Sequence, residues 1–136
     1  MDERLKGKRI LVFDDEPHVR HGVRLVLEMA GFDVVTAEAG EQAIDLSQTA
    51  NPELIILDII SPHKEDELPA RRSEEGIDVC RAIKGNPITR DIPVIMLSVK
   101  GEVQDREKAE KAGADDYMTK PFNSSELMER VERLLA

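Results

Sequence analysis

Five stretches of the chain have the hydrophobic pattern of β-strands, and three of them are apolar runs that end in a polar residue. Short aliphatic runs of this kind are typical of strands buried on both faces of a parallel sheet. We expect the strands at residues 8–13, 32–36, 54–58, 92–97 and 115–119. In a parallel sheet the polar residues that end these runs lie together at the carboxyl edge, where α/β proteins bind their ligands.

Apolar residues recur at helical spacing between the predicted strands. Pro17 suits a first helical turn and Gly31 a helix end, while Asn123 and Glu126 have the spacing of a capping box. The expected helices cover residues 17–30, 40–50, 77–84, about 102–112 and about 124–135. This alternation predicts an α/β fold, a doubly wound (βα)5 domain whose five-stranded parallel sheet is covered on both faces.

Residues 63–75 interrupt the alternation with mostly charged side chains, a proline and few residues that a core would bury. We expect a surface insertion within a single domain that covers residues 1–136. A solvated loop is the simpler interpretation of this insertion. An extra helical turn that begins at residues 68–72, or a role in docking a partner, is the alternative.

The composition narrows the possible functions. A net charge of −9 disfavours direct binding to nucleic acid, because phosphate contacts depend on clustered Lys and Arg. The single cysteine, Cys80, cannot form an internal disulfide, suits a reducing cytosol and is expected in the core. Residues 1–9 lack a secretory apolar segment and no apolar stretch is long enough to span a membrane, so we expect a cytoplasmic protein without membrane contact.

Ionic and hydroxyl side chains follow four of the predicted strands. Asp14 and Asp15 follow the first strand, Asp58 ends the third, Ser98 follows the fourth and Lys120 the fifth. Because these positions share one edge of the sheet, we expect them to converge. Three carboxylates at close range repel one another unless a cation compensates them, and Mg²⁺ prefers such oxygen ligands. With the lysine and the hydroxyl, the site is suited to stabilising a phosphoryl group in transfer.

Each of these residues has a simpler interpretation when taken alone. The acid pair could charge the first turn of the next helix, Ser98 could be a strand-end hydroxyl, and Lys120 could be solvated. His18 and His21 have helical spacing, but no third metal ligand is evident nearby, so solvated histidines are the simpler interpretation. The convergence of acids, hydroxyl and lysine on one edge favours the phosphoryl-transfer site.

Four segments resemble the motifs of response-regulator receiver domains of two-component signalling. They occur in the family's order and span nearly the whole chain, at residues 10–17, 54–58 with Pro62, 92–98 and 112–122. The resemblance implies a flavodoxin-like strand order 2-1-3-4-5. It also implies a signalling switch rather than a turnover enzyme, phosphorylated by a sensor histidine kinase or a phosphotransfer protein of a phosphorelay.

The resemblance also assigns roles to the acidic residues of the site. It implies that Asp58 is the phosphoacceptor, which takes a phosphoryl group from a phosphohistidine. It implies a Mg²⁺ ion held by Asp14, Asp15 and Asp58 and by the backbone carbonyl of Ile60, with Asp15 as a direct ligand.

The same resemblance implies a switch that carries the phosphorylation signal. Ser98 and Lys120 would contact the phosphoryl group, and Tyr117 would move inward together with the serine. The bond between Lys120 and Pro121 is usually cis in such domains. The signal would alter a face formed by about 102–112, the fifth strand and about 124–135, where an output partner or a second copy binds.

Two positions depart from the family pattern. Gly76, which matches the family's helix-opening glycine, comes later than usual after Asp58, so access to the acceptor is expected to differ. Val99 stands next to Ser98, where the family commonly has a smaller residue. The larger side chain narrows the approach of water or of a partner, so the rate of dephosphorylation is expected to differ from the usual one.

Two other function classes are the alternatives. A Mg²⁺-dependent phosphohydrolase could also form an aspartyl phosphate on a parallel sheet, but such enzymes commonly carry a second acid where this chain has Ile60. A degenerate receiver used only to bind proteins would lack some of the site residues. None of them is missing here.

Overall fold

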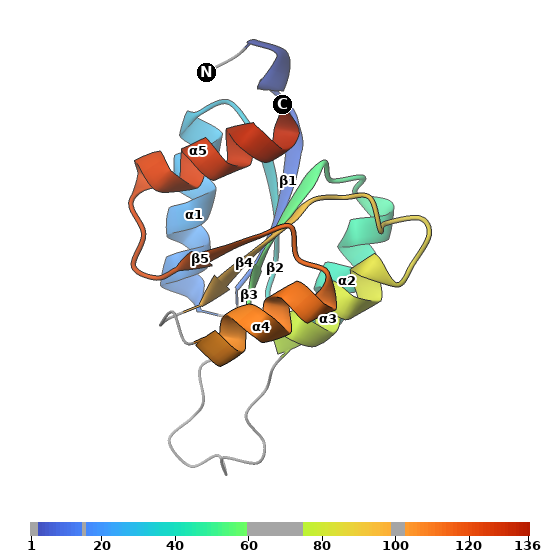
Figure 1. Cartoon of the computed structure of the whole chain (residues 1–136). Coiled ribbons are helices and arrows are strands. Elements are labelled where there is room, and N and C mark those ends of the chain that lie inside the picture. The colour runs from blue at the N-terminus through green and yellow to red at the C-terminus, as the bar shows by residue number, and fades with distance from the viewer. Residues whose placement is uncertain (1–2, 15, 60–74, 99–102) are drawn as a thin grey trace.

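The computed structural model describes residues 3–14, 16–59, 75–98 and 103–136. All neighbouring strands in these residues pair in parallel, and they form one sheet in the order β2-β1-β3-β4-β5 (Figure 1). The strands are β1 (Arg9–Phe13), β2 (Asp33–Ala37), β3 (Leu54–Asp58), β4 (Val94–Ser98) and β5 (Asp116–Thr119). The predicted fold class and strand order are confirmed.

Helices cover both faces of the sheet, with α1 and α5 on one face and α2, α3 and α4 on the other (Figure 1). The helices are η1 (Glu3–Leu5), α1 (Pro17–Met29), α2 (Gly40–Thr49), α3 (Glu75–Lys84), α4 (Val103–Ala112) and α5 (Ser124–Leu135). Helix α3 begins at Glu75, the last residue of the predicted insertion, and the rest of that insertion lies outside the described residues.

Alternate residues of the central strands serve two separate cores. In β3, Leu54 and Ile56 pack with residues of α1 and α5, whereas Ile55 and Leu57 pack with residues of α2, α3 and α4. Successive side chains of a strand point to opposite faces, so a strand between two helical layers must be apolar throughout. Every residue of β3 is buried, and this strand therefore presents Asp58 from a rigid support.

The helix ends largely follow the predicted local signals. Pro17 begins α1, and the Asn123 side chain accepts a hydrogen bond from Glu126 N at 2.7 Å, which is one half of the predicted capping box. Cys80 is fully buried, as expected. No helix within the described ranges has the length and apolar character that a membrane span requires.

Candidate functional site

Lys120 joins two carboxylates from different strands at the carboxyl edge of the sheet. Its Nζ lies 2.8 Å from Asp14 Oδ2 and 3.2 Å from Asp58 Oδ1. Asp14 directly follows β1 and Asp58 is the last residue of β3, and these strands are neighbours in the sheet. The structure thus brings together three of the predicted site residues, Asp14, Asp58 and Lys120.

All three groups are shielded from solvent. The side chains of Asp14 and Asp58 are 1% and 4% exposed, and that of Lys120 is 14% exposed. Burial disfavours the charged ammonium and lowers the pKa of Lys120. The hydrogen bonds and charges of Asp14 and Asp58 outweigh this effect, so the pKa lies above its ordinary value. Lys120 is therefore a cation throughout the physiological pH range.

The segment after β1 is held by its own side chains and by α1. Asp14 Oδ1 accepts a hydrogen bond from Glu16 N at 2.9 Å, and the Glu16 side chain caps α1 by accepting from His18 N. Arg20 of α1 donates from Nη1 to the backbone oxygen of Asp14 at 2.8 Å, and its Nη2 lies 3.4 Å from Glu38 Oε1. The sequence analysis did not predict a role for Arg20. The one feature that could have indicated it is the position of Arg20 near the start of the helix that follows Asp14 and Asp15.

Ser98 lies at the same edge and is 3% exposed. It ends β4 and pairs in register with Thr119 of β5, and its backbone oxygen accepts a hydrogen bond from Lys120 N at 2.5 Å. The Lys120–Pro121 bond is cis, as the resemblance implied. The backbone of Ser98 is thus hydrogen-bonded to the backbone of Lys120, the residue whose side chain contacts both carboxylates.

The ring of Tyr117 is buried against the α4 side of the sheet. It belongs to the same core as Ala109 and Ala112 of α4, and the guanidinium of Arg106 lies 5.8 Å from its centroid. Its hydroxyl is buried and has no hydrogen-bond partner among the described residues.

Some predicted site residues lie outside the described part of the chain. These are Asp15, Ile60 and Val99. Within the described residues no group of three or more His, Cys, Asp and Glu side chains could hold a metal ion. Asp15 is not among the described residues. His18 and His21 are both exposed on α1.

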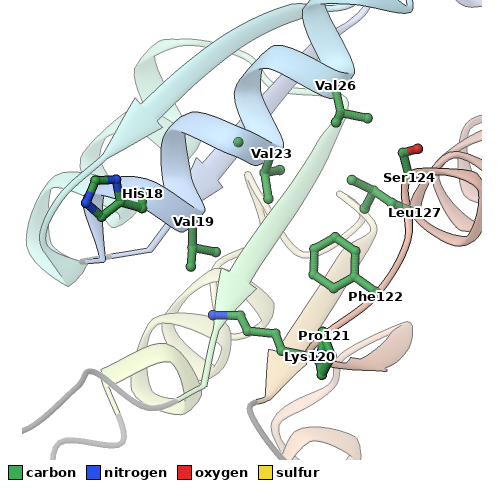
Figure 2. A pocket seen from close by; sticks show the side chains of 10 residues that line it. His18, Val19, Val23, Val26, Lys120, Pro121, Phe122, Ser124 and Leu127 are labelled. Carbon is green, nitrogen blue, oxygen red and sulfur yellow. The ribbon is translucent and has the colours of Figure 1, made fainter.

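An open apolar groove of about 490 Å³ adjoins the site between α1 and the segment that leads into α5. Figure 2 shows Val19 and Val23 of α1 on one side, Phe122 and Leu127 on the other, and Lys120 at one end. Lys120 thus lines the groove, and its ammonium is held by the two carboxylates.

The fold and the site define a flavodoxin-like α/β protein with buried carboxylates and a lysine at the carboxyl edge of its sheet. The family model described as the response regulator receiver domain matches residues 10–132. The chain belongs to this family, so the resemblance to receiver domains that its sequence motifs indicate is confirmed. Response regulator receiver domains are signalling modules of two-component systems rather than turnover enzymes.

Two relatives illustrate the similarity in sequence. The phosphate regulon transcriptional regulatory protein PhoB of Pseudomonas aeruginosa is 39% identical over 95% of this chain and 52% of its own length. The DNA-binding dual master transcriptional regulator RpaA of Synechocystis is 39% identical over 93% of this chain and 48% of its own length. The chain thus spans about half the length of the curated relatives it matches.

Two solved structures show the same fold. The Francisella response regulator 1452 receiver domain superposes with a TM-score of 0.78 at 29% identity, over 95% of this chain and 97% of that one. The receiver domain of the Pseudomonas aeruginosa sensor histidine kinase PA1611 also gives 0.78, at 27% identity, over 95% of this chain and 98% of that one. A magnesium ion is coordinated in the active site cleft of the PA1611 domain.

Proposed function

We propose that residues 1–136 form a single receiver domain in which Asp58 accepts a phosphoryl group from a sensor histidine kinase or a phosphotransfer protein. The observation that carries the proposal is the buried ammonium of Lys120, held between Asp14 and Asp58. A site that receives a dianionic phosphoryl group needs positive charge beside the acceptor, and Lys120 supplies it 3.2 Å from Asp58 Oδ1. The test is to incubate the protein with Mg²⁺ and acetyl phosphate and to map the modified residue.

The proposed reaction is a displacement at phosphorus. A carboxylate oxygen of Asp58 forms a bond to the phosphorus, and the bond from phosphorus to the donor's imidazole nitrogen breaks. The leaving imidazole takes the electron pair of that bond. Lys120 stabilises the negative charge on the phosphoryl oxygens, and Ser98 offers one hydrogen bond. Hydrolysis of the acyl phosphate later returns Asp58 to a carboxylate.

The donor set of the site suits a hard divalent cation. Asp14, Asp58 and Lys120 together carry a formal net charge of −1, and Asp15 is adjacent in sequence. Asp14, Asp15, Asp58 and the backbone carbonyl of Ile60 would hold Mg²⁺. When bound, the ion would neutralise part of the charge that the phosphoryl group brings to the site. The magnesium site of the PA1611 receiver domain supports this assignment.

Asp15→Ala should weaken Mg²⁺ binding by at least about tenfold, because a site with few protein ligands loses one of its carboxylates. Calorimetric titration of the unphosphorylated protein with MgCl₂ measures this directly. Asp45→Ala, which removes an exposed carboxylate from α2, is the matched control and should bind Mg²⁺ as the wild type does. An unchanged affinity in Asp15→Ala would rule out its role as a direct ligand.

We further propose that Ser98 and Tyr117 transmit phosphorylation to the face formed by α4, β5 and α5. A phosphoryl group brings up to about two negative charges and strong acceptor oxygens to the site, toward which the Ser98 hydroxyl turns. Arg130 links α5 to β5, since its Nη1 lies 2.6 Å from Asp116 Oδ1 and 3.3 Å from the backbone oxygen of Tyr117. A movement of Tyr117 could therefore reach α5. This face would bind an output partner or a second copy of the chain.

Beryllofluoride, a stable mimic of the phosphoryl group, should change NMR shifts in α4, β5 and α5 of the wild-type protein. In Ser98→Ala and Tyr117→Ala these distant changes should shrink while those near Asp58 persist. Tyr117→Phe is the matched variant, because it removes only the hydroxyl and keeps the buried ring. Shift changes that are identical in all four proteins would show that this pair does not couple the site to that face.

The proposed setting follows from the same assignment. We propose that the domain works in the cytoplasm, where sensor kinases expose their phosphohistidines, and that it binds neither nucleic acid nor membrane itself. The relatives named as transcriptional regulators are about twice as long as this chain. The net charge of −9 supports a protein partner rather than a nucleic acid.

A further inference from the structure

Gly76, in the first turn of α3, packs directly against the backbone of Asp58. A Cβ atom at position 76 would lie 1.7 Å from the carbonyl oxygen of Asp58, 2.6 Å from its carbonyl carbon and 2.9 Å from Cα of Ile59. The φ angle of Gly76 is not in the left-handed region, so this close approach, and not backbone strain, demands glycine. No side chain fits here unless α3 or the end of β3 moves.

Glu75, the residue before it, accepts a hydrogen bond from the start of helix α2. Its Oε1 accepts a hydrogen bond at 2.5 Å from Gly40 N, the first residue of α2, across a sequence separation of 35. The N-cap residue of α2, Ala39, makes no side-chain hydrogen bond to the helix. Glu75 therefore supplies from α3 the cap that α2 lacks, and its negative charge suits the positive end of that helix.

These two contacts fix the point where the chain returns to the sheet after Asp58. A long connection leaves the position of the next helix weakly defined, because the entropy of closing a loop rises with its length. The Glu75 cap ties the start of α3 to α2, and Gly76 then places the first turn of α3 against the peptide that follows the acceptor. Together they restrict how far the end of β3 can shift relative to Lys120.

We propose that Glu75 and Gly76 are positioning residues, which hold the Asp58 carboxylate at the distance from Lys120 that phosphorylation requires. The inference rests on the proposed role of Asp58 as the acceptor. Glu75 acts as a hydrogen-bond acceptor for Gly40 N, so glutamine can replace it and alanine cannot. Gly76 acts through the absence of a side chain, so no other residue can replace it.

The test compares the rate of phosphorylation by acetyl phosphate in Glu75→Ala, Glu75→Gln and the control Asp78→Ala. Asp78 lies on the same helical turn, and its side chain is 75% exposed. Glu75→Ala should lower the maximal rate about tenfold, a fraction of the hundredfold loss that a 1 Å misplacement can cause. The acetyl phosphate concentration at half the maximal rate should change little. Glu75→Gln and Asp78→Ala should retain the wild-type rate.

Gly76→Ala should lower the maximal rate about a hundredfold, because it forces the two backbones apart. Melting curves establish whether each variant is folded at the assay temperature. If Gly76→Ala does not fold, the comparison of the two Glu75 variants decides the question. A wild-type rate in folded Glu75→Ala, or an equal loss in Glu75→Gln, overturns the positioning role. Wild-type protein that is not labelled on Asp58 overturns the proposed function instead.

Discussion

Asp58→Asn should abolish the acyl phosphate that wild-type protein forms with Mg²⁺ and acetyl phosphate. Asparagine has nearly the same shape as aspartate, but its amide is not a nucleophile, so the variant loses the chemistry and keeps the packing. Asp58 is 4% exposed at the end of a fully buried strand, which limits rearrangement around the new side chain. Intact-mass measurement should show one added phosphoryl group on the wild type and none on the variant.

The control for this experiment is a carboxylate that lies away from the site. Asp45→Asn, on the exposed face of α2, should be labelled to the same extent as the wild type. Hydroxylamine should remove the label, because it attacks the carbonyl carbon of an acyl phosphate but does not cleave a phosphoserine at Ser98. Equal labelling of Asp58→Asn and the wild type would exclude Asp58 as the acceptor.

The strands, and the polar residues at their carboxyl ends, could be predicted from the sequence because the sheet is buried on both faces. A strand between two helical layers must be apolar throughout, so the residue where polarity returns marks the carboxyl edge. Asp58 and Ser98 each close such a run, and both are found buried at the ends of β3 and β4. The contacts of Lys120 with Asp14 and Asp58 then follow from the parallel order of the strands.

The contacts that hold the edge together could not be predicted in the same way. The cap that Glu75 gives to Gly40 and the bond from Arg20 to the carbonyl of Asp14 depend on how helices cross the sheet. Local patterns carry no information on such pairs. The family resemblance identifies Gly76 as a helix-opening glycine, but its close approach to the Asp58 carbonyl is visible only in three dimensions. The burial of the Tyr117 ring likewise depends on the packing of α4.

Lys120→Met should lower the stability of the unphosphorylated protein by about 3 to 5 kcal/mol, the usual cost of removing one partner from a buried ion pair. The substitution keeps the aliphatic stem but removes the ammonium that contacts the buried carboxylates of Asp14 and Asp58. For a domain of this size the loss corresponds to a fall of about 10 to 18 °C in melting temperature. Calorimetry in a buffer with a chelator measures the effect without bound metal.

Magnesium and pH separate this electrostatic effect from a simple loss of packing. Mg²⁺ should raise the melting temperature of Lys120→Met more than that of the wild type, because the ion supplies the positive charge that the variant lacks. The pKa of Lys120 is raised, so its stabilising contribution is fully present below the ordinary lysine pKa of about 10.4 and disappears as pH rises through the raised value. The difference between variant and wild type should therefore stay constant from neutral to mildly alkaline pH.

The matched control is Lys111→Met, which removes an exposed ammonium from α4. Surface substitutions of this kind usually change stability by less than about 0.5 kcal/mol, and Mg²⁺ should act on this variant as it does on the wild type. If Lys120→Met were as stable as Lys111→Met in the absence of metal, the ammonium would not be compensating the two carboxylates. The electrostatic basis of the proposed phosphoryl site would then be wrong, because a site that tolerates two uncompensated buried carboxylates gains nothing from a lysine between them.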